Sequence, residues 1–197
     1  MNGVKQIPWV GGNIQGHAFD TSGQIDSTEG FGAFDHVLSS HALGTRIVDV
    51  GGGAFDANSA YVAEKYQLDC SVYDPYKRSE EHNKRLITKS ASHPFDAALS
   101  FSVLNVISEG QARMDHIHLC RDFLKPGGKA IFKVWPGDQT GVGKQTASGY
   151  QSNRSIDTYV DEIQTTFGSQ NVFFDPKAKT IRCSNPVMTY PSGTRSI

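Results

Sequence analysis

The 197-residue sequence predicts an α/β fold, a doubly wound and mostly parallel sheet with an antiparallel C-terminal hairpin. Short apolar runs alternate with segments of helical periodicity from residue 46 onward, which is typical of a parallel sheet covered on both faces. One apolar run ends in the triplet Gly51–Gly53, and a second ends in the acid Asp74 about 20 residues later. The last two apolar runs are close enough in sequence to form a hairpin.

The individual elements follow from apolar runs, helical periodicity and their stop signals. Strands are expected at 46–50, 69–73, from 95 onward, at 129–135, 171–174 and 180–183, and helices at 34–43, 58–66, 79–86, 111–123 and 156–167. Glycine and proline predict turns at 89–94 and 125–128. A polar, glycine-rich connection at 136–153 has about 18 residues and is longer than most connections.

The chain is expected to hold one domain with two extensions. Residues 1–32 are rich in glycine and polar residues and lack a sustained period, so they are interpreted as a loop or lid. Residues 33–190 are expected to form the single domain, and residues 191–197 a frayed tail.

The charge, the cysteines and the apolar runs of the sequence indicate which kinds of partner and compartment to expect. The net charge is −1, from 19 basic and 20 acidic residues, so tight non-specific binding to nucleic acid is not implied. The three cysteines are widely spaced without a CxxC pair, which favours reduced thiols in a cytoplasmic protein. We see neither a signal-peptide pattern nor an apolar run of about 20 residues, so no membrane partner is expected.

The glycine triplet and two acids form the candidate binding site. Gly51, Gly52 and Gly53 would allow the backbone to approach a ligand without Cβ atoms in the way. Asp49 and Asp74 end neighbouring predicted strands, and the carboxyl ends of parallel strands are where such sheets bind ligands. The pattern predicts an adenine nucleoside site, the alternative being a plain tight turn.

Four segments resemble the successive motifs of class I S-adenosylmethionine-dependent methyltransferases. They are Val48-Asp-Val-Gly-Gly-Gly53, Tyr73-Asp-Pro75, Phe95-Asp-Ala-Ala-Leu-Ser100 and Leu124-Lys-Pro-Gly-Gly-Lys129, in the order and spacing of that family. The resemblance covers about residues 45 to 135 and implies a Rossmann-like methyltransferase fold with S-adenosyl-L-methionine as cofactor.

The resemblance also implies roles for single residues. Asp49 and the three glycines would line the methionine part of the cofactor, and Asp74 would hold the ribose. Ser100, Phe101 and Ser102 would pass the sulfonium side. Asn105 stands where many small-molecule methyltransferases carry a histidine.

Two departures from the family pattern limit the assignment. Only 21 residues separate Asp74 from Asp96, so the third strand is expected to be short or missing, and residues 82–87 are a candidate for its adenine contacts. The fourth motif is not Asn/Asp-Pro-Pro-Tyr, which would cradle an exocyclic amine, and the Pro-Cys pair of a cytosine C5 enzyme is absent.

The segment 136–154 follows the last motif strand, where the resemblance implies that it faces the transferred methyl group. Asn105–Ile107, Gly137-Asp138, Gly141–Lys144 and Tyr150–Arg154 together resemble uncharacterised methyltransferase-like proteins of phages and mobile elements.

Candidates for catalysis and for a metal site are few. The catalytic candidates are Asn105, Tyr150 and His17, with His82 as a further possible base. No metal site is expected, because His116 and His118 lie two residues apart on different faces of their helix.

The expected function is methyl transfer to an unidentified acceptor, with a small molecule favoured. Two alternatives stay open: a regulatory or interaction protein that binds S-adenosylmethionine without transferring methyl, and a nucleic-acid methyltransferase of a mobile element. A nicotinamide oxidoreductase fits less well, because the third glycine or alanine of its fingerprint would fall at Asp56.

Overall fold

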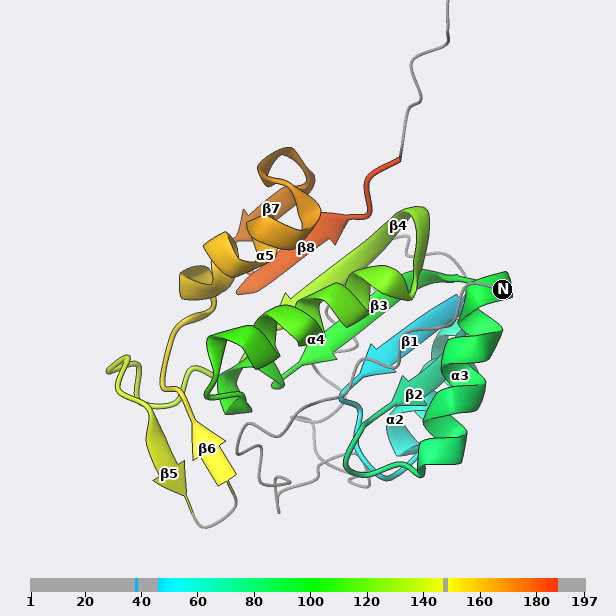
Figure 1. The fold of residues 1–197 in the computed structure, drawn as a ribbon, viewed down its shortest axis with the longest axis horizontal. Helices are drawn as coiled ribbons and strands as arrows, with labels where there is room; N and C mark the ends of the chain where they lie inside the picture. The colour runs from blue at the N-terminus through cyan, green and yellow to red at the C-terminus, as the bar shows by residue number, and fades with distance from the viewer. Residues whose placement is uncertain (1–37, 39–45, 147–148, 188–197) are drawn as a thin grey trace, which may run out of the picture.

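The computed structural model describes residues 38, 46–146 and 149–187, and it contains a six-stranded sheet. In spatial order the strands are β2 (Asp69–Tyr73), β1 (Arg46–Val50), β3 (Phe95–Phe101), β4 (Leu124–Lys133), β8 (Thr180–Ser184) and β7 (Val172–Asp175). The first four are parallel, while β8 and β7 are antiparallel to their neighbours (Figure 1). The predicted parallel sheet with a C-terminal hairpin is confirmed.

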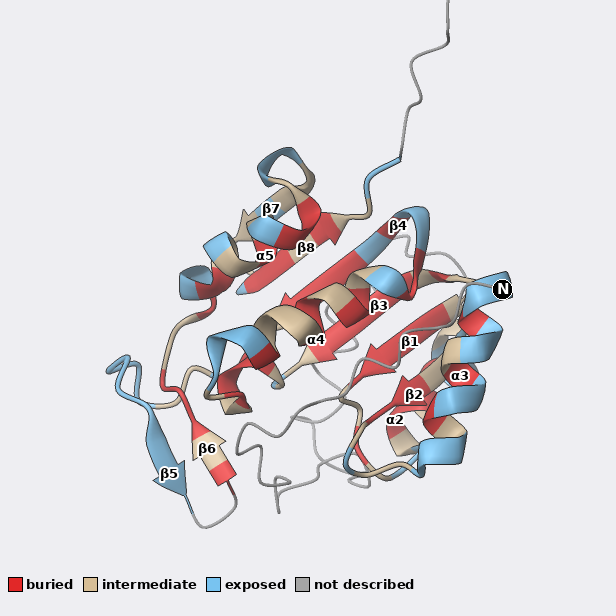
Figure 2. Ribbon diagram, in the orientation of Figure 1, coloured by how far each residue is buried: buried red, intermediate tan, exposed pale blue. Residues whose placement is uncertain are grey.

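Helices cover both faces of the sheet, as expected for a doubly wound fold. On one face lie α3 (Glu80–Ser92), α4 (Gly110–Asp122) and α5 (Val160–Phe167), the last preceded by a 3-10 turn at Ile156–Tyr159. On the other face lies α2 (Ala57–Tyr66), which buries Val62 against the sheet (Figure 1). The central strands β1 and β3 are buried along most of their length (Figure 2).

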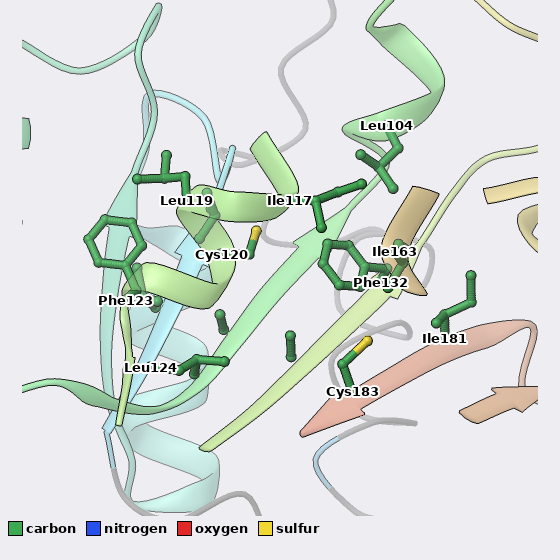
Figure 3. Close-up of a cluster of buried hydrophobic side chains, with 14 of the residues drawn as sticks. Leu104, Ile117, Leu119, Cys120, Phe123, Leu124, Phe132, Ile163, Ile181 and Cys183 are labelled. Carbon is green, nitrogen blue, oxygen red and sulfur yellow. The ribbon is translucent and has the colours of Figure 1, made fainter. Parts of the chain in front are cut away.

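Aromatic and branched side chains fill the larger core between the sheet and the helices α4 and α5 (Figure 3). Phe123 packs edge-on against Phe95 at 5.9 Å between ring centroids, and Phe132 packs edge-on against Phe167 at 6.3 Å. Cys120 and Cys183 lie in the same core as free thiols, and Cys70 is also free. The core therefore anchors β3 and β4, the two strands whose ends lead to the site described below.

Between β2 and β3 the described chain forms α3 and no strand, so the expected loss of the family's third strand is confirmed. The predicted helix end near residue 86 and the turn from residue 89 are wrong, because α3 continues to Ser92. Residues 87–92 contain no helix breaker, and Ser90 is buried. Pro94 provides the stop, since a proline disfavours helical geometry at the residue before it, here His93.

The predicted turn at 125–128 is present as an interruption within β4. Phe95 pairs with Leu124 and Ala97 pairs with Lys129, so four residues bulge out of the ladder. Gly127 has a φ of 77°, and its N–H donates to the carbonyl of Asn185 at 2.9 Å. The turn is therefore held by the segment that follows β8, and β4 begins earlier than predicted.

The long connection after β4 contains a small hairpin, β5 (Lys144–Thr146) and β6 (Gly149–Gln151), which the sequence did not predict. The hairpin lies at the end of the sheet toward which the parallel strands point (Figure 1). No helix within the described ranges has the length and apolar character needed to cross a membrane. The expected lid at 1–32, the tail at 191–197 and all of the helix at 34–43 except Leu38 lie outside the described residues.

We expect the substitution Phe132→Ala to lower the free energy of unfolding by about 3–5 kcal/mol, because a fully buried ring would be replaced by a cavity. Urea unfolding followed by circular dichroism measures the change. The matched control is Phe173→Ala, because Phe173 is 56% exposed. This control should lower the free energy of unfolding by less than about 1 kcal/mol, a loss that includes the contact of the Arg182 guanidinium with the Phe173 ring. Equal losses in the two variants would contradict this assignment of the core.

Candidate functional site

The glycine turn after β1 lies against the end of β2. The N–H of Gly51 donates to the carbonyl of Tyr73 at 2.7 Å, and the N–H of Gly53 donates to Asp74 Oδ2 at 3.0 Å. Gly51 and Gly53 have φ values of 90° and 82°, which side chains rarely adopt. The turn is thus set by backbone geometry that favours glycine and by hydrogen bonds to the end of β2 and the residue after it.

Two of the glycines are also required by close packing. A Cβ on Gly51 would lie 2.5 Å from Val103 Cγ2, and a Cβ on Gly52 would lie 2.5 Å from Asp49 Oδ2. The turn therefore touches both the Asp49 carboxylate and the segment that follows β3. This contact brings the predicted residues after β1 and β3 together.

Asp74 connects the turns that follow β1 and β2. Its Oδ2 accepts from Gly53, and its Oδ1 accepts from the backbone N–H groups of Tyr76 and Lys77, each at 2.9 Å. The side chain of Asn83 in α3 donates to the Asp74 carbonyl at 2.9 Å. An ionised carboxylate has about four acceptor positions, so roughly one is left for a ligand.

Arg78 is a site residue that sequence reasoning missed. Its Nε donates to the Gly53 carbonyl at 2.7 Å, its Nη2 to the Phe55 carbonyl at 2.8 Å, and its Nη1 pairs with Asp56 at 2.8 Å. The guanidinium thereby holds the far side of the glycine turn. The only sequence signal was an arginine four residues after Asp74.

Asp49 carries the most perturbed carboxyl group of the site. It is 4% exposed, and its pKa is raised to about 7, first by burial and then by the nearby charge of Asp74, while Arg78 acts in the opposite direction. Near neutral pH the carboxyl is therefore divided between its two protonation states. A cationic ligand beside it would favour the ionised form.

The three residues predicted to pass the sulfonium are separated by the structure. The Ser100 hydroxyl is buried and hydrogen-bonds His116 Nε2 at 2.8 Å, and burial lowers the pKa of His116 to about 4. Phe101 packs against the core on the opposite face of the sheet. Ser102 is exposed at the strand end with a φ of 59°, and its N–H donates to the Lys133 carbonyl at 2.8 Å. A cofactor role for these residues stays a prediction.

Asn105 lies in a 3-10 turn, η1 (Leu104–Val106), and is joined to β6. Asn105 Nδ2 donates to Gln151 Oε1 at 2.9 Å, and Gln151 Nε2 donates to the Trp135 carbonyl at 3.1 Å. The N–H of Ser152 donates to the Asn105 carbonyl at 2.8 Å. Asn105 Oδ1 is buried and accepts no hydrogen bond from the described part of the chain. The missed partner here is Gln151, whose only signal was its place in Tyr150–Arg154.

The remaining polar residues of the connection pair with one another. Asn153 Nδ2 donates to the Val142 carbonyl at 2.9 Å, and the Asn153 carbonyl accepts from Gly141 at 2.8 Å. Lys144 pairs with Asp138 at 2.6 Å. Tyr150, a predicted catalytic candidate, is half-buried with its hydroxyl over Gly143. These contacts give the connection a defined shape.

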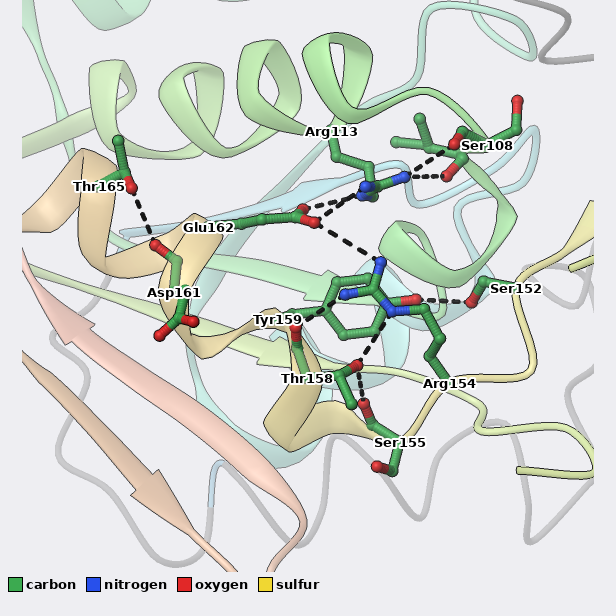
Figure 4. A network of polar contacts seen from close by, with 11 residues as sticks. Ser108, Arg113, Ser152, Arg154, Ser155, Thr158, Tyr159, Asp161, Glu162 and Thr165 are labelled. Atoms are coloured by element: carbon green, nitrogen blue, oxygen red, sulfur yellow. Dashed lines mark hydrogen bonds and ion pairs between the residues drawn. The ribbon is translucent and has the colours of Figure 1, made fainter. Parts of the chain in front are cut away.

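An arginine and carboxylate cluster fixes the C-terminal end of the connection (Figure 4). Arg113 of α4 binds both Glu162 oxygens, at 2.8 and 2.9 Å, and Arg154 stacks on the Tyr159 ring at 4.3 Å. The Tyr159 hydroxyl hydrogen-bonds the Ser152 hydroxyl at 2.6 Å. The segment 152–154 is therefore tied to α4 and to the start of α5.

The histidine candidates contribute little to the observed geometry. His17 lies outside the described residues. His82 Nε2 is 2.8 Å from the carbonyl of Val72, an acceptor, so this nitrogen carries the proton. Among residues 38, 46–146 and 149–187, no group of three or more His, Cys, Asp or Glu residues could hold a metal ion.

Neither a protein-family model nor a curated protein matches the sequence. The fold is nevertheless similar to that of solved methyltransferases. A Burkholderia thailandensis 1,6-didemethyltoxoflavin-N1-methyltransferase, solved with that compound and S-adenosylhomocysteine, superposes with a TM-score of 0.53 at 16% identity, over 78% of this chain and 76% of that one.

Two further solved methyltransferases have a similar fold. Human N-acetylserotonin methyltransferase, in complex with S-adenosylmethionine, has a TM-score of 0.53 at 13% identity, over 81% of this chain and 53% of that one. A sugar N-methyltransferase from a Streptoalloteichus species has a TM-score of 0.51 at 9% identity, over 77% of this chain and 85% of that one. At such identities the likeness establishes the Rossmann-like methyltransferase fold, and the activity has to be argued from the site.

We expect Gly51→Ala to destabilise the protein by about 2–4 kcal/mol, because it adds a clash with Val103 to the strain of a positive φ. The matched control is Gly141→Ala, which has a φ of 72° but no atom within 4 Å of the new Cβ. It should cost only about 1–2 kcal/mol. Thermal unfolding measures both, and equal losses would show that packing against Val103 is unimportant.

We expect Asp49→Asn to stabilise the protein at pH 8, by on the order of 2–4 kcal/mol. The raised pKa means that the folded state holds a proton that the unfolded state releases between about pH 4 and pH 7. Wild-type stability should therefore fall as the pH rises through this window. Urea unfolding at several pH values should show that the difference between the two proteins nearly vanishes at about pH 4. A pH-independent difference would contradict the buried titration of Asp49.

Proposed function

We propose that this protein transfers a methyl group from S-adenosylmethionine to a small-molecule acceptor. The observation that carries the proposal is Asp49, a buried carboxyl group with a raised pKa that directly contacts the glycine turn. Such a group is stabilised by a bound cation, and the cofactor carries a sulfonium and an ammonium. The likeness to methyltransferase folds supports the same conclusion.

The residues present fit this cofactor. Asp49 would receive its ammonium group, next to the backbone of Gly51–Gly53, and Asp74 would receive a ribose hydroxyl at its remaining acceptor position. Val103 and η1 adjoin the glycine turn and would face the reacting end.

The bound cofactor would supply an already activated methyl group on a positively charged sulfur. The protein then has to align the acceptor with the methyl group and exclude water, and a base is needed only where the acceptor carries a proton that must leave first. Neither Asn105 nor the neutral His116, which is engaged with Ser100, is a strong base. The site therefore suits an acceptor that is nucleophilic without prior deprotonation.

A near-neutral charge of −1 supports a small molecule over nucleic acid as the acceptor. The second candidate function is binding of S-adenosylmethionine without transfer. It is favoured by one observation: Gln151, Ser152 and Asn153 are all buried next to η1 and leave little open surface there. Formation of S-adenosylhomocysteine in the presence of an acceptor separates the two functions.

We expect calorimetry to show that S-adenosylhomocysteine, which keeps the ammonium group, binds the protein. Its affinity should rise about tenfold between about pH 6 and pH 8, because the ligand's ammonium selects the ionised form of Asp49. Asp49→Asn should weaken binding and remove that part of the pH dependence. The control is Asp138→Asn, whose exposed carboxylate lies on the connection, and it should bind as the wild type does. No binding at any of these pH values would overturn the proposed function.

A further inference from the structure

The side-chain oxygen of Asn105 is a buried hydrogen-bond acceptor without a donor. Asn105 is 2% exposed, and no described residue donates a hydrogen bond to Oδ1. Buried polar atoms of native proteins are almost always paired, because an unpaired one keeps the full cost of losing its water. The missing donor therefore requires an explanation.

The neighbouring hydrogen bonds determine which end of the Asn105 amide is unpaired. The Trp135 carbonyl only accepts, so the Gln151 atom facing it at 3.1 Å has to be the donor Nε2. Gln151 then presents Oε1, so the Asn105 atom facing it at 2.9 Å has to be Nδ2. The atom left over is Oδ1, an acceptor, and its absent partner must carry an N–H or O–H group.

Asn105 lies where an acceptor molecule would have to meet the cofactor. The sheet order β2-β1-β3-β4 places the segment after β3 between the glycine turn after β1 and Trp135 after β4. Val103, two residues before Asn105, packs directly on Gly51. The unpaired oxygen therefore belongs to the segment that adjoins the proposed cofactor site.

Trp135 provides a second and independent observation. Its carbonyl is held by Gln151, yet the residue is 61% exposed. An exposed indole offers a flat apolar surface on which planar rings stack. The Gln151 carboxamide thus binds Asn105 at one end and the Trp135 carbonyl at the other. Asn105 supplies an unpaired acceptor, and Trp135 supplies an aromatic surface.

We propose that Asn105 Oδ1 and the Trp135 ring form an acceptor subsite for a planar, uncharged molecule that carries an N–H group. This inference rests on the proposed function and deepens it, because it names the substrate class. An amide oxygen orients an N–H group but cannot remove its proton. This suits an amino nitrogen, which carries both an N–H and a lone pair, better than a hydroxyl.

The transfer at this subsite balances without a further reactant. The lone pair of the acceptor nitrogen forms the new N–C bond while the C–S bond breaks and its electron pair stays on sulfur. The positive charge thereby arrives on nitrogen, whose N–H proton then leaves to water. Oδ1 is closed to bulk solvent in this structure, so the ligand enters with a local opening and makes its hydrogen bond in a water-poor environment.

The test uses Trp135 as its own reporter. The chain has two tryptophans, Trp9 and Trp135, so a Trp9→Phe background leaves one indole N–H signal in a ¹⁵N spectrum. The protein, with and without saturating S-adenosylhomocysteine, is titrated with 2-aminopyridine and with pyridine at about pH 8.5, where both are neutral. The two probes share a planar ring and differ in the N–H group.

We expect both probes to shift the Trp135 signal and 2-aminopyridine to bind about three- to tenfold more tightly, which is the effect of one buried hydrogen bond. Asn105→Leu should remove this preference, because leucine has no acceptor oxygen. If Asn105→Leu does not fold, Asn105→Ala replaces it. The cofactor affinity of each folded variant should stay within about twofold of the wild type.

Three results would overturn the subsite: equal affinity for the two probes, a preference that survives in Asn105→Leu or Asn105→Ala, or no response of Trp135 to either probe. The last result would leave water as the partner of Oδ1. Calorimetry with S-adenosylhomocysteine reports on the proposed function separately. If that ligand fails to bind, the titration without it still tests the subsite.

Discussion

The carboxylate of Asp74 is the interaction on which the rest of the site depends. It accepts three backbone N–H bonds from two turns that are about 20 residues apart in sequence, one after β1 and one after β2. Parallel strands have no tight turn between them, so their ends need some other connection to keep a common position. Asp74 makes that connection through the Gly53 N–H, and Arg78 makes a second one through the Gly53 carbonyl. The approach of the glycine turn to Asp49 and Val103 follows from this anchoring.

This arrangement leaves the site short of one positive charge. The charge of Asp74 is stabilised by amides, and the Arg78 guanidinium is taken up by carbonyls and by Asp56. Asp49 forms no ion pair with a described residue, and its charged form is disfavoured by burial and by the repulsion of Asp74. Holding such a group costs folding free energy, a cost that proteins accept chiefly where binding benefits from it. The electrostatic strain and the proposed ligand are thus two aspects of one feature.

Local signals explain which parts could be predicted. The bounds of β1 and β2 and the C-terminal hairpin were confirmed, because apolar runs ended by glycine or acidic residues determine them over a few residues. The helix α3 was predicted too short, since residues 87–92 are neutral in propensity and only Pro94 decides its end. The Ser100–His116 and Asn105–Gln151 pairs were not predicted, because their partners are 16 and 46 residues apart in sequence. Such pairs form only once the sheet is assembled. The sequence therefore indicated the residues around the glycine turn better than the polar pairs around Asn105.

The proposed acceptor side consists of buried polar side chains where an apolar core could have stood. Gln151, Ser152 and Asn153 are buried in succession, and each makes hydrogen bonds, to Asn105, Tyr159 and Val142 respectively. Polar pairing specifies geometry more narrowly than apolar contact, because each bond restricts both distance and angle. It also allows exchange, since a ligand with matching donors and acceptors can replace an internal bond at little net cost. A surface of hydrogen-bonded side chains can be ordered and still admit a molecule. At Asn105 Oδ1 such a molecule would add a missing hydrogen bond instead of breaking an existing one.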